Sequence, residues 1–188
     1  ARSSSENYTF HGGILVHTTI REGTMHYLVT GGAGFIGSAF VRRLALRDST
    51  AKITVLDNLS FASNFSLIEH LVRTKRVEFK KLDLRNLSEL EGNFGWPDLV
   101  VNFAAETHVD RSILDPGLFV GTNVVGTYNL LEVASQRGIQ KFIQISTDEV
   151  YGPKVEGESL EGDPLAPSSP YAASKAAADL VALSYFRT

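Results

Sequence analysis

The sequence has 188 residues, of which 43% are hydrophobic and 21% are charged, and its formal net charge is −3. This composition is typical of one globular domain, and the mild negative charge gives no reason to expect nucleic acid or an anionic membrane as a partner. The absence of cysteine from the sequence excludes disulfides and thiolate metal sites. Because no apolar run is long enough to cross a bilayer, we expect a soluble, cytoplasmic protein.

Residues 1–24 differ in composition from the rest of the chain. They are rich in Ser, Thr and Gly, and they lack the basic start and apolar stretch of a signal peptide. We interpret them as an added or native extension, although β-branched residues in 10–20 could form a strand. A globular domain is expected to begin at Met25 and to occupy residues 25–188.

Short apolar runs alternate with helical patterns throughout this domain. In chain order we expect a strand at 26–30, a helix at 35–47, strands at 53–56, 77–82 and 98–104, a helix at 115–137, a strand at 141–146, a loop at 156–169 and a helix from 170 onward. Strands that alternate with helices indicate a parallel sheet with helices on both faces. The predicted fold class is therefore α/β, a doubly wound parallel sheet of Rossmann type.

A glycine-rich segment follows the first of these strands. Gly32, Gly34 and Gly37 form a G-x-G-x-x-G pattern, and Asp57 lies 20 residues after Gly37 at the end of the next strand. This is the context of a dinucleotide-binding loop, in which bare backbone and a helix N-terminus approach a pyrophosphate. A tight turn without a ligand is the alternative. Asp57 could accept hydrogen bonds from the adenosine ribose and would repel a 2′-phosphate, so NAD is favoured over NADP.

Tyr171 and Lys175 lie four residues apart and therefore share one face of the last expected helix. A nearby ammonium would stabilise a phenolate and let Tyr171 exchange a proton with a hydroxyl that is being oxidised. A Tyr-x-x-x-Lys pair alone is common on helices. Its position after the fifth strand of a dinucleotide fold favours the catalytic interpretation.

Two adjacent acids, Asp148 and Glu149, follow the fifth strand in the segment 146–152. Ligands of open α/β sheets lie at the carboxyl ends of the strands, so both carboxylates would face the cofactor. They could divide acid and base work if their environments separate their pKa values. An acid pair that only caps a loop is the alternative.

Together these residues resemble the extended short-chain dehydrogenase/reductase family from Met25 to Thr188. The T-G-G-A-G-F-I-G segment at 30–37, the Asp83-Leu84 pair and Tyr171 with Lys175 are marks of the whole family. The segments 102–112 and 146–152 are similar to those of the dTDP-glucose 4,6-dehydratases. Related epimerases and decarboxylases usually carry a small residue in place of Asp148.

The resemblance implies an NAD-dependent lyase that converts dTDP-glucose into its 4-keto-6-deoxy product. Tyr171, helped by Lys175, would take the proton of the sugar 4-hydroxyl, and Thr147 would hydrogen-bond the 4-oxygen. Glu149 would remove the proton at carbon 5 while Asp148 protonates the departing 6-hydroxyl. Hydride would leave carbon 4 for NAD and return at carbon 6.

The same resemblance implies a set of cofactor contacts and no metal. The implied contacts are Gly31, Gly34, Phe35, Ile36, Gly37, Asp57, Asn58, Asp83, Leu84, Ala104, Ala105, Glu106, Asn123, Tyr171 and Lys175. Asp83 and Leu84 would contact adenine. Asn123 would support the active site from its helix, with a buried helix-packing amide as an equally weighted alternative.

Members of this family continue well beyond the point that residue 188 matches. The resemblance therefore implies that the C-terminal substrate domain is absent from this chain and that residues 1–188 alone turn over little substrate. It also implies a homodimer paired through the helices at 115–137 and 170–187. Two alternatives remain, a UDP-sugar 4-epimerase or decarboxylase of the same family and an NAD-binding module without catalysis.

Overall fold

The computed structural model describes residues 10–11, 14–15, 24–154 and 156–188. Its centre is a five-stranded parallel sheet with the strand order β5-β4-β3-β6-β7. The strands are β3 (His26–Thr30), β4 (Lys52–Asp57), β5 (Glu78–Lys81), β6 (Leu99–Asn102) and β7 (Phe142–Gln144). The order reverses between β3 and β6, which confirms the doubly wound sheet and places its crevice at the carboxyl ends of these two strands.

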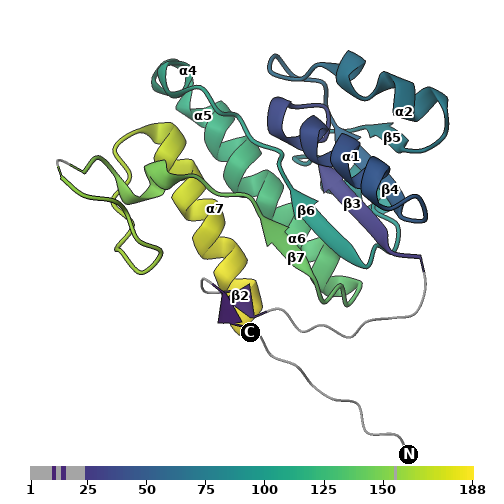
Figure 1. The fold of residues 1–188 in the computed structure, drawn as a ribbon. Helices are drawn as coiled ribbons and strands as arrows, with labels where there is room; N and C mark the ends of the chain where they lie inside the picture. Colours follow the sequence, from purple (N-terminus) through teal and green to yellow (C-terminus); the bar gives the residue numbers. More distant parts are fainter. Residues whose placement is uncertain (1–9, 12–13, 16–23, 155) are drawn as a thin grey trace, which may run out of the picture.

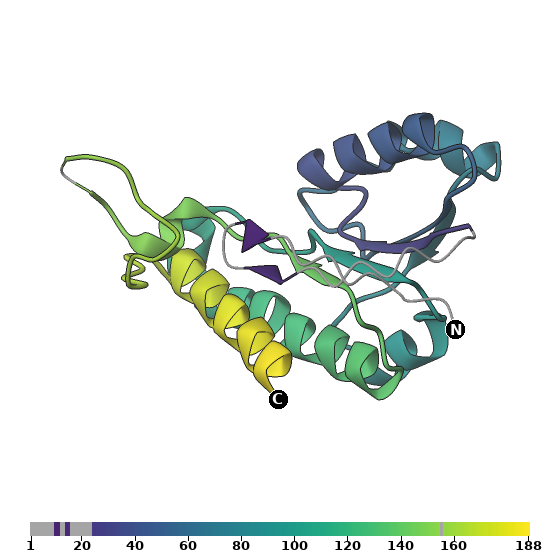
Figure 2. The ribbon, with the colours of Figure 1, turned by 60° about the horizontal axis from the view of Figure 1, so that its bottom comes forward.

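Helices cover both faces of this sheet (Figure 1, Figure 2). On one face lies α1 (Phe35–Arg47), followed along the chain by η1 (Phe65–Leu67) and α2 (Glu69–Arg73). On the other face lie α3 (Leu87–Asn93) and α6 (Gly126–Gln136), and α7 (Pro170–Arg187) packs against α6. Leu28 and Val29 are both fully buried and belong to opposite cores, because successive strand side chains point to opposite faces.

The helix predicted at 115–137 is present, but it contains an irregular turn. It comprises α5 (Pro116–Phe119), the π-helical η2 (Val120–Val125) and α6. Asp115 caps its start by accepting a hydrogen bond from the Leu118 nitrogen at 3.2 Å. Gly138, with φ 66°, closes its end in a Schellman motif, because the nitrogens of Gly138 and Ile139 donate back to the last turn at 2.9 Å. The π turn was not predicted.

Several short elements were also missing from the prediction. They are η1, α2, α3, α4 (Val109–Leu114) and the 3₁₀ turn η3 (Asp148–Tyr151). In the segment 10–20, β1 (Phe10–His11) pairs antiparallel with β2 (Ile14–Leu15), and the rest of the strand predicted there lies outside the described residues. No helix in the described part of the chain has the length and apolar character needed to span a bilayer.

Candidate active site

The turn between β3 and α1 is built from backbone that leaves no room for side chains. Gly31 has φ 68°, and a Cβ atom there would lie 2.5 Å from the backbone nitrogen of Ala104. A Cβ atom on Gly37 would overlap the carbonyl oxygen of Gly31. Glycine is therefore required at both positions, because Gly31 lies against the segment that follows β6 and the start of α1 lies against Gly31.

The N-terminus of α1 is open toward the crevice. Gly34 is its N-cap, no side chain caps it, and its first turn contains no acidic residue. The first N–H groups of a helix have no partner within the helix, and together with the helix dipole they attract anions. Phe35 and Ile36 are 86% and 63% exposed, so this end is accessible. The donor set fits the pyrophosphate of a dinucleotide.

Asp57 holds the glycine turn in place. Its carboxylate accepts hydrogen bonds from the Ala33 nitrogen at 2.9 Å, the Leu59 nitrogen at 2.8 Å and the Ser63 hydroxyl at 2.8 Å. A carboxylate offers about four acceptor positions, so one position remains for a ribose hydroxyl. Asp57 therefore has a structural role in addition to the predicted cofactor contact.

The pair Asp83-Leu84 follows β5 and lies beside the end of β4, where the Leu82 nitrogen donates to the Asp57 carbonyl oxygen at 3.2 Å. The Arg85 guanidinium donates hydrogen bonds to the Asp83 carboxylate from Nε at 3.0 Å and from Nη2 at 2.6 Å. These hydrogen bonds lower the pKa of Asp83. Asn58 also hydrogen-bonds Asp83. The Leu84 side chain is only 7% exposed and packs in the core below α6, so a contact of Leu84 with a ligand would have to use its backbone.

The segment after β6 is tied to the helix behind it. Ala104 and Ala105 are half-buried, whereas Glu106 is buried. The Glu106 nitrogen donates to Asn123 Oδ1 at 2.8 Å, and Asn123 Nδ2 donates to the Glu106 carbonyl oxygen at 3.0 Å. The Glu106 carboxylate pairs with Arg111 Nη1 at 3.3 Å. This segment therefore has a fixed path along the crevice.

Asn123 also reaches the last helix. Its Nδ2 donates to Ser174 Oγ at 2.8 Å, and Ser174 Oγ donates to the carbonyl oxygen of Tyr171 at 2.7 Å. Asn123 lies in the π-helical turn η2, a conformation that occurs frequently at functional sites. Its amide thus supports the site from behind, and its three hydrogen bonds to protein leave little capacity for a cofactor.

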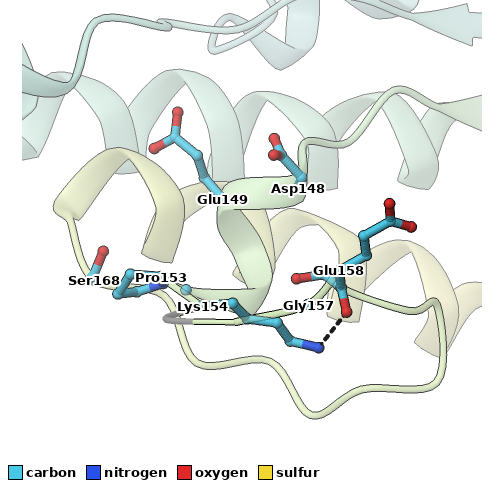
Figure 3. Close-up of a pocket in the computed structure, with 9 residues that line it drawn as sticks. Asp148, Glu149, Pro153, Lys154, Gly157, Glu158 and Ser168 are labelled. Carbon is cyan, nitrogen blue, oxygen red and sulfur yellow. Dashed lines mark hydrogen bonds between the residues drawn. The ribbon is translucent and has the colours of Figure 1, made fainter.

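The two acids lie on the turn η3. Thr147 is its N-cap and accepts a hydrogen bond from the Glu149 nitrogen at 3.3 Å. The carboxylates of Asp148 and Glu149 are exposed and project to the same side of this turn (Figure 3). Both residues line a hollow of about 590 Å³ that is completed by the loop after η3, with Gly152, Pro153, Lys154, Gly157, Glu158, Ser159 and Ser168. Its size falls in the range of small-molecule sites.

Tyr171 lies beside these acids. It is 8% exposed and contacts the Phe119 ring edge-on, with 6.3 Å between the ring centroids. Burial raises the pKa of the Tyr171 phenol, a hydrogen bond with Thr147 lowers it, and the charges of Glu149 and Asp148 raise it. The structure therefore brings together the acid pair and the phenol that the sequence predicted to meet.

Lys175 is 5% exposed, and its Nζ donates to the carbonyl oxygen of Ile145 at 2.5 Å. Burial lowers the pKa of this ammonium, and the charge of Asp179 opposes that shift. The predicted help of Lys175 to Tyr171 stays a prediction, because Nζ is hydrogen-bonded to Ile145 and the charge of Lys175 is not among the causes that shift the pKa of Tyr171. Within the described residues, no group of three or more His, Asp or Glu could hold a metal ion.

Three residues that support this site were not predicted. Ser174 joins Asn123 to Tyr171, and Ser146 and Asp179 join the end of β7 to α7. The spacing of Asp179, four residues after Lys175, was the signal that could have identified it. Ser146 opens the segment 146–152 that was singled out from the sequence, but its contact with α7 was not predicted, and no comparable signal marks Ser174.

Comparison with known proteins identifies the family of this chain. The chain belongs to the NAD-dependent epimerase/dehydratase family, which matches residues 27–188. A dTDP-glucose 4,6-dehydratase from Actinoplanes sp. is 46% identical over 169 residues, which cover 87% of this chain and 53% of that protein. The enzyme of the same name from Neisseria gonorrhoeae is 43% identical over 180 residues, which cover 89% of this chain and 52% of that protein. The chain spans about half the length of the curated relatives it matches.

Solved structures give the same result. The dTDP-glucose 4,6-dehydratase DesIV from Streptomyces venezuelae, solved with NAD bound, has a TM-score of 0.83 and 45% identity and is matched over 87% of this chain and 52% of its own. A UDP-Glc/GlcNAc 4-epimerase from Campylobacter jejuni has a TM-score of 0.81 and 35% identity, over 87% of this chain and 49% of its own. Because dehydratases and epimerases share the fold, the reaction has to be argued from the side chains of the site.

Proposed function

We propose that the protein containing this chain is an NAD-dependent nucleotide-sugar 4,6-dehydratase, a lyase that acts on dTDP-glucose. The observation that carries this proposal is the proximity of two carboxylates to a buried tyrosine, since the charges of Glu149 and Asp148 act on the Tyr171 phenol. Oxidation of one sugar hydroxyl requires a single proton acceptor. Loss of water requires two more groups, one that removes a carbon-bound proton and one that protonates the leaving hydroxyl.

The cofactor site is proposed at the switch point of the sheet. The N-terminus of α1, behind Gly34, would bind the pyrophosphate, and the remaining acceptor position of Asp57 would bind the adenosine ribose. The segment 104–106 would line the crevice, and Asp83 with Asn58 would lie at the adenine end. When bound, NAD would accept hydride from sugar carbon 4 and give it back at carbon 6.

Three side chains, Tyr171, Glu149 and Asp148, would exchange protons with the sugar, and Thr147 and Lys175 would assist them. Tyr171 would take the proton of the 4-hydroxyl, and Thr147 would hydrogen-bond the same oxygen. Because burial and the two carboxylates raise the pKa of Tyr171, the phenol needs a positive charge in order to act as a base, and Lys175 lies one helical turn away. Once carbon 4 is a ketone, the carbon 5 proton is acidic enough for Glu149 to remove, and Asp148 would protonate the 6-hydroxyl so that it leaves as water. Glu149 would return a proton to carbon 5 when hydride is added at carbon 6.

The assay is proton NMR of dTDP-glucose incubated with the full-length protein and NAD. The expected product is the 4-keto-6-deoxy sugar nucleotide. Asp148→Asn should abolish this product while leaving NAD affinity, measured by calorimetry, unchanged. Asp110→Asn, which changes an exposed acid of α4, serves as the control and should remain active. A 4-epimer as product would instead identify an epimerase, and NAD binding with no change in the sugar would identify a binding module.

We also propose a homodimer formed through α6 and α7. Large apolar side chains of these two helices are exposed, Tyr128 45%, Leu180 57%, Leu183 41% and Phe186 64%, as is Val125 at the end of η2 (43%). Burial of such a surface favours association. Light scattering of the full-length protein should give twice the monomer mass, and a monomer would contradict this proposal. We propose, separately, a cytoplasmic location, because a sequence without cysteine is compatible with a reducing compartment.

A further inference from the structure

Two consecutive residues after β7 are held by two residues one turn apart on α7. Lys175 Nζ donates to the carbonyl oxygen of Ile145 at 2.5 Å. Ser146 Oγ donates to Oδ2 of Asp179. Because residues four apart share one helix face, both hydrogen bonds fix the same strand end to the same face of α7. The acid turn η3 begins two residues later, so this double contact sets its position relative to Tyr171.

The carboxylate of Asp179 is incompletely paired. Its Oδ1 is buried and has no hydrogen-bond partner among the described residues. A buried carboxylate oxygen without a partner is unfavourable unless an opposite charge compensates for it. Lys175, one turn earlier, is that charge. Burial lowers the pKa of Lys175 and raises the pKa of Asp179, and the attraction between the two charges opposes both shifts.

Other titratable groups on the elements packed against α7 have different partners. Glu132 of α6 accepts a hydrogen bond from Tyr185 at 2.6 Å, and Arg111 of α4 pairs with Glu106. The remaining groups on these elements are Asp110 in α4, Tyr128 in α6, and Asp148, Glu149 and Tyr151 in η3. The sequences of α5 and η2 contain no titratable residue. Asp179 is the charged group that acts on Lys175.

We propose that Asp179 is a positioning residue: held by Ser146, its carboxylate keeps the Lys175 ammonium, which the Ile145 carbonyl oxygen fixes one helical turn from Tyr171, in its charged form. Without this carboxylate, burial would favour a neutral amine, which cannot stabilise a phenolate. The role of the Lys175 charge depends on the proposed function, in which Tyr171 is the base. The interaction between Asp179 and Lys175 can be measured without any turnover.

The test is the titration of Lys175, followed by NMR in the full-length protein labelled with ¹³C at lysine side chains. The Lys175 signal is assigned by its loss in Lys175→Met. Asp179→Asn keeps the size of the side chain and an acceptor for Ser146 but removes the charge, so Lys175 should lose its proton at a lower pH than in the wild type. Glu132→Gln, an acid-to-amide change on the neighbouring helix, is the matched control and should leave this titration unchanged.

Ser146→Ala provides a second variant. It leaves the charge of Asp179 but removes the hydrogen bond that holds the carboxylate in position, so Lys175 should shift in the same direction by a smaller amount. If Asp179→Asn does not fold, the Lys175 titration in Ser146→Ala alone tests the proposal. A Lys175 titration that is unchanged in the folded variants overturns the proposal.

The pH profile of kcat/KM gives an independent readout. Because Lys175 must be charged, activity is lost as pH rises through its pKa, and Asp179→Asn should move this alkaline limb to lower pH with little change in NAD affinity. An alkaline limb that stays in place would contradict the assigned role. If the full-length protein does not dehydrate dTDP-glucose, the proposed function fails, and the NMR comparison still decides the role of Asp179.

Discussion

Asn123 offers the most direct structural prediction, because one buried amide joins two parts of the site. Its side chain is 1% exposed and makes three hydrogen bonds, two with the backbone of Glu106 and one with Ser174. Asn123→Ala removes all three and leaves the Glu106 nitrogen buried without an acceptor. With about 1 kcal/mol for each lost bond and a further penalty for the unpaired N–H, the free energy of unfolding should fall by roughly 3–4 kcal/mol.

The assay is urea denaturation followed by circular dichroism, with Asn129→Ala as the matched control. Asn129 is also a buried helical amide, 5% exposed, and it donates to the carbonyl oxygens of Leu84 at 2.9 Å and Arg85 at 3.3 Å. Its removal leaves no backbone N–H without an acceptor, so we expect the free energy of unfolding to fall by a smaller amount, about 1–2 kcal/mol. An Asn123→Ala variant that is no less stable than Asn129→Ala would refute the proposed bridging role of the Asn123 amide.

Two further predictions concern the cofactor end of the crevice. Gly31 and Gly138 have similar φ angles, 68° and 66°, but an added Cβ atom meets the Ala104 backbone at Gly31 and nothing at Gly138. Gly138→Ala should therefore lower the free energy of unfolding by about 1 kcal/mol. Gly31→Ala should lower it by about 1–3 kcal/mol more and abolish NAD binding. Equal melting temperatures for the two variants would contradict this. The Arg85 guanidinium lowers the pKa of Asp83, so their ion pair stabilises the fold above the unfolded pKa of the carboxyl and loses this effect as the pH falls below about 4. The pair is partly exposed and its contribution is at most about 1 kcal/mol; Asp83→Asn should flatten the stability curve in that range, and an unchanged curve would exclude the pairing.

The arrangement of the sheet could be predicted because it follows from the alternation of strands and helices. The strand at 26–30 and the helix at 35–47 were predicted with the bounds that the structure shows. Asp115-Pro116 and Gly138 correctly marked the two ends of one long helix. The π turn inside that helix was not predictable, because the change from i−4 to i−5 hydrogen bonds has no residue signature of its own.

The partners of the site residues were harder to predict than their positions. Helical spacing placed Tyr171 and Lys175 on one face, but it did not predict that Thr147 acts on the pKa of the phenol or that the ammonium hydrogen-bonds the carbonyl oxygen of Ile145. Asp57 was expected to bind ribose, yet most of its acceptor capacity serves backbone and hydroxyl donors of the protein itself. Such pairings depend on the tertiary path of loops, which periodicity and spacing do not determine.

The central claim is that the acid turn η3 and Tyr171 act on one sugar beside one nicotinamide. The most direct test is the reaction of dTDP-glucose carrying deuterium at carbon 4 with the full-length protein and NAD. Transfer of hydride out and back within one site predicts deuterium at carbon 6 of the 4-keto-6-deoxy product. Deuterium that stays at carbon 4, in unchanged substrate or in a 4-epimer, would contradict the account.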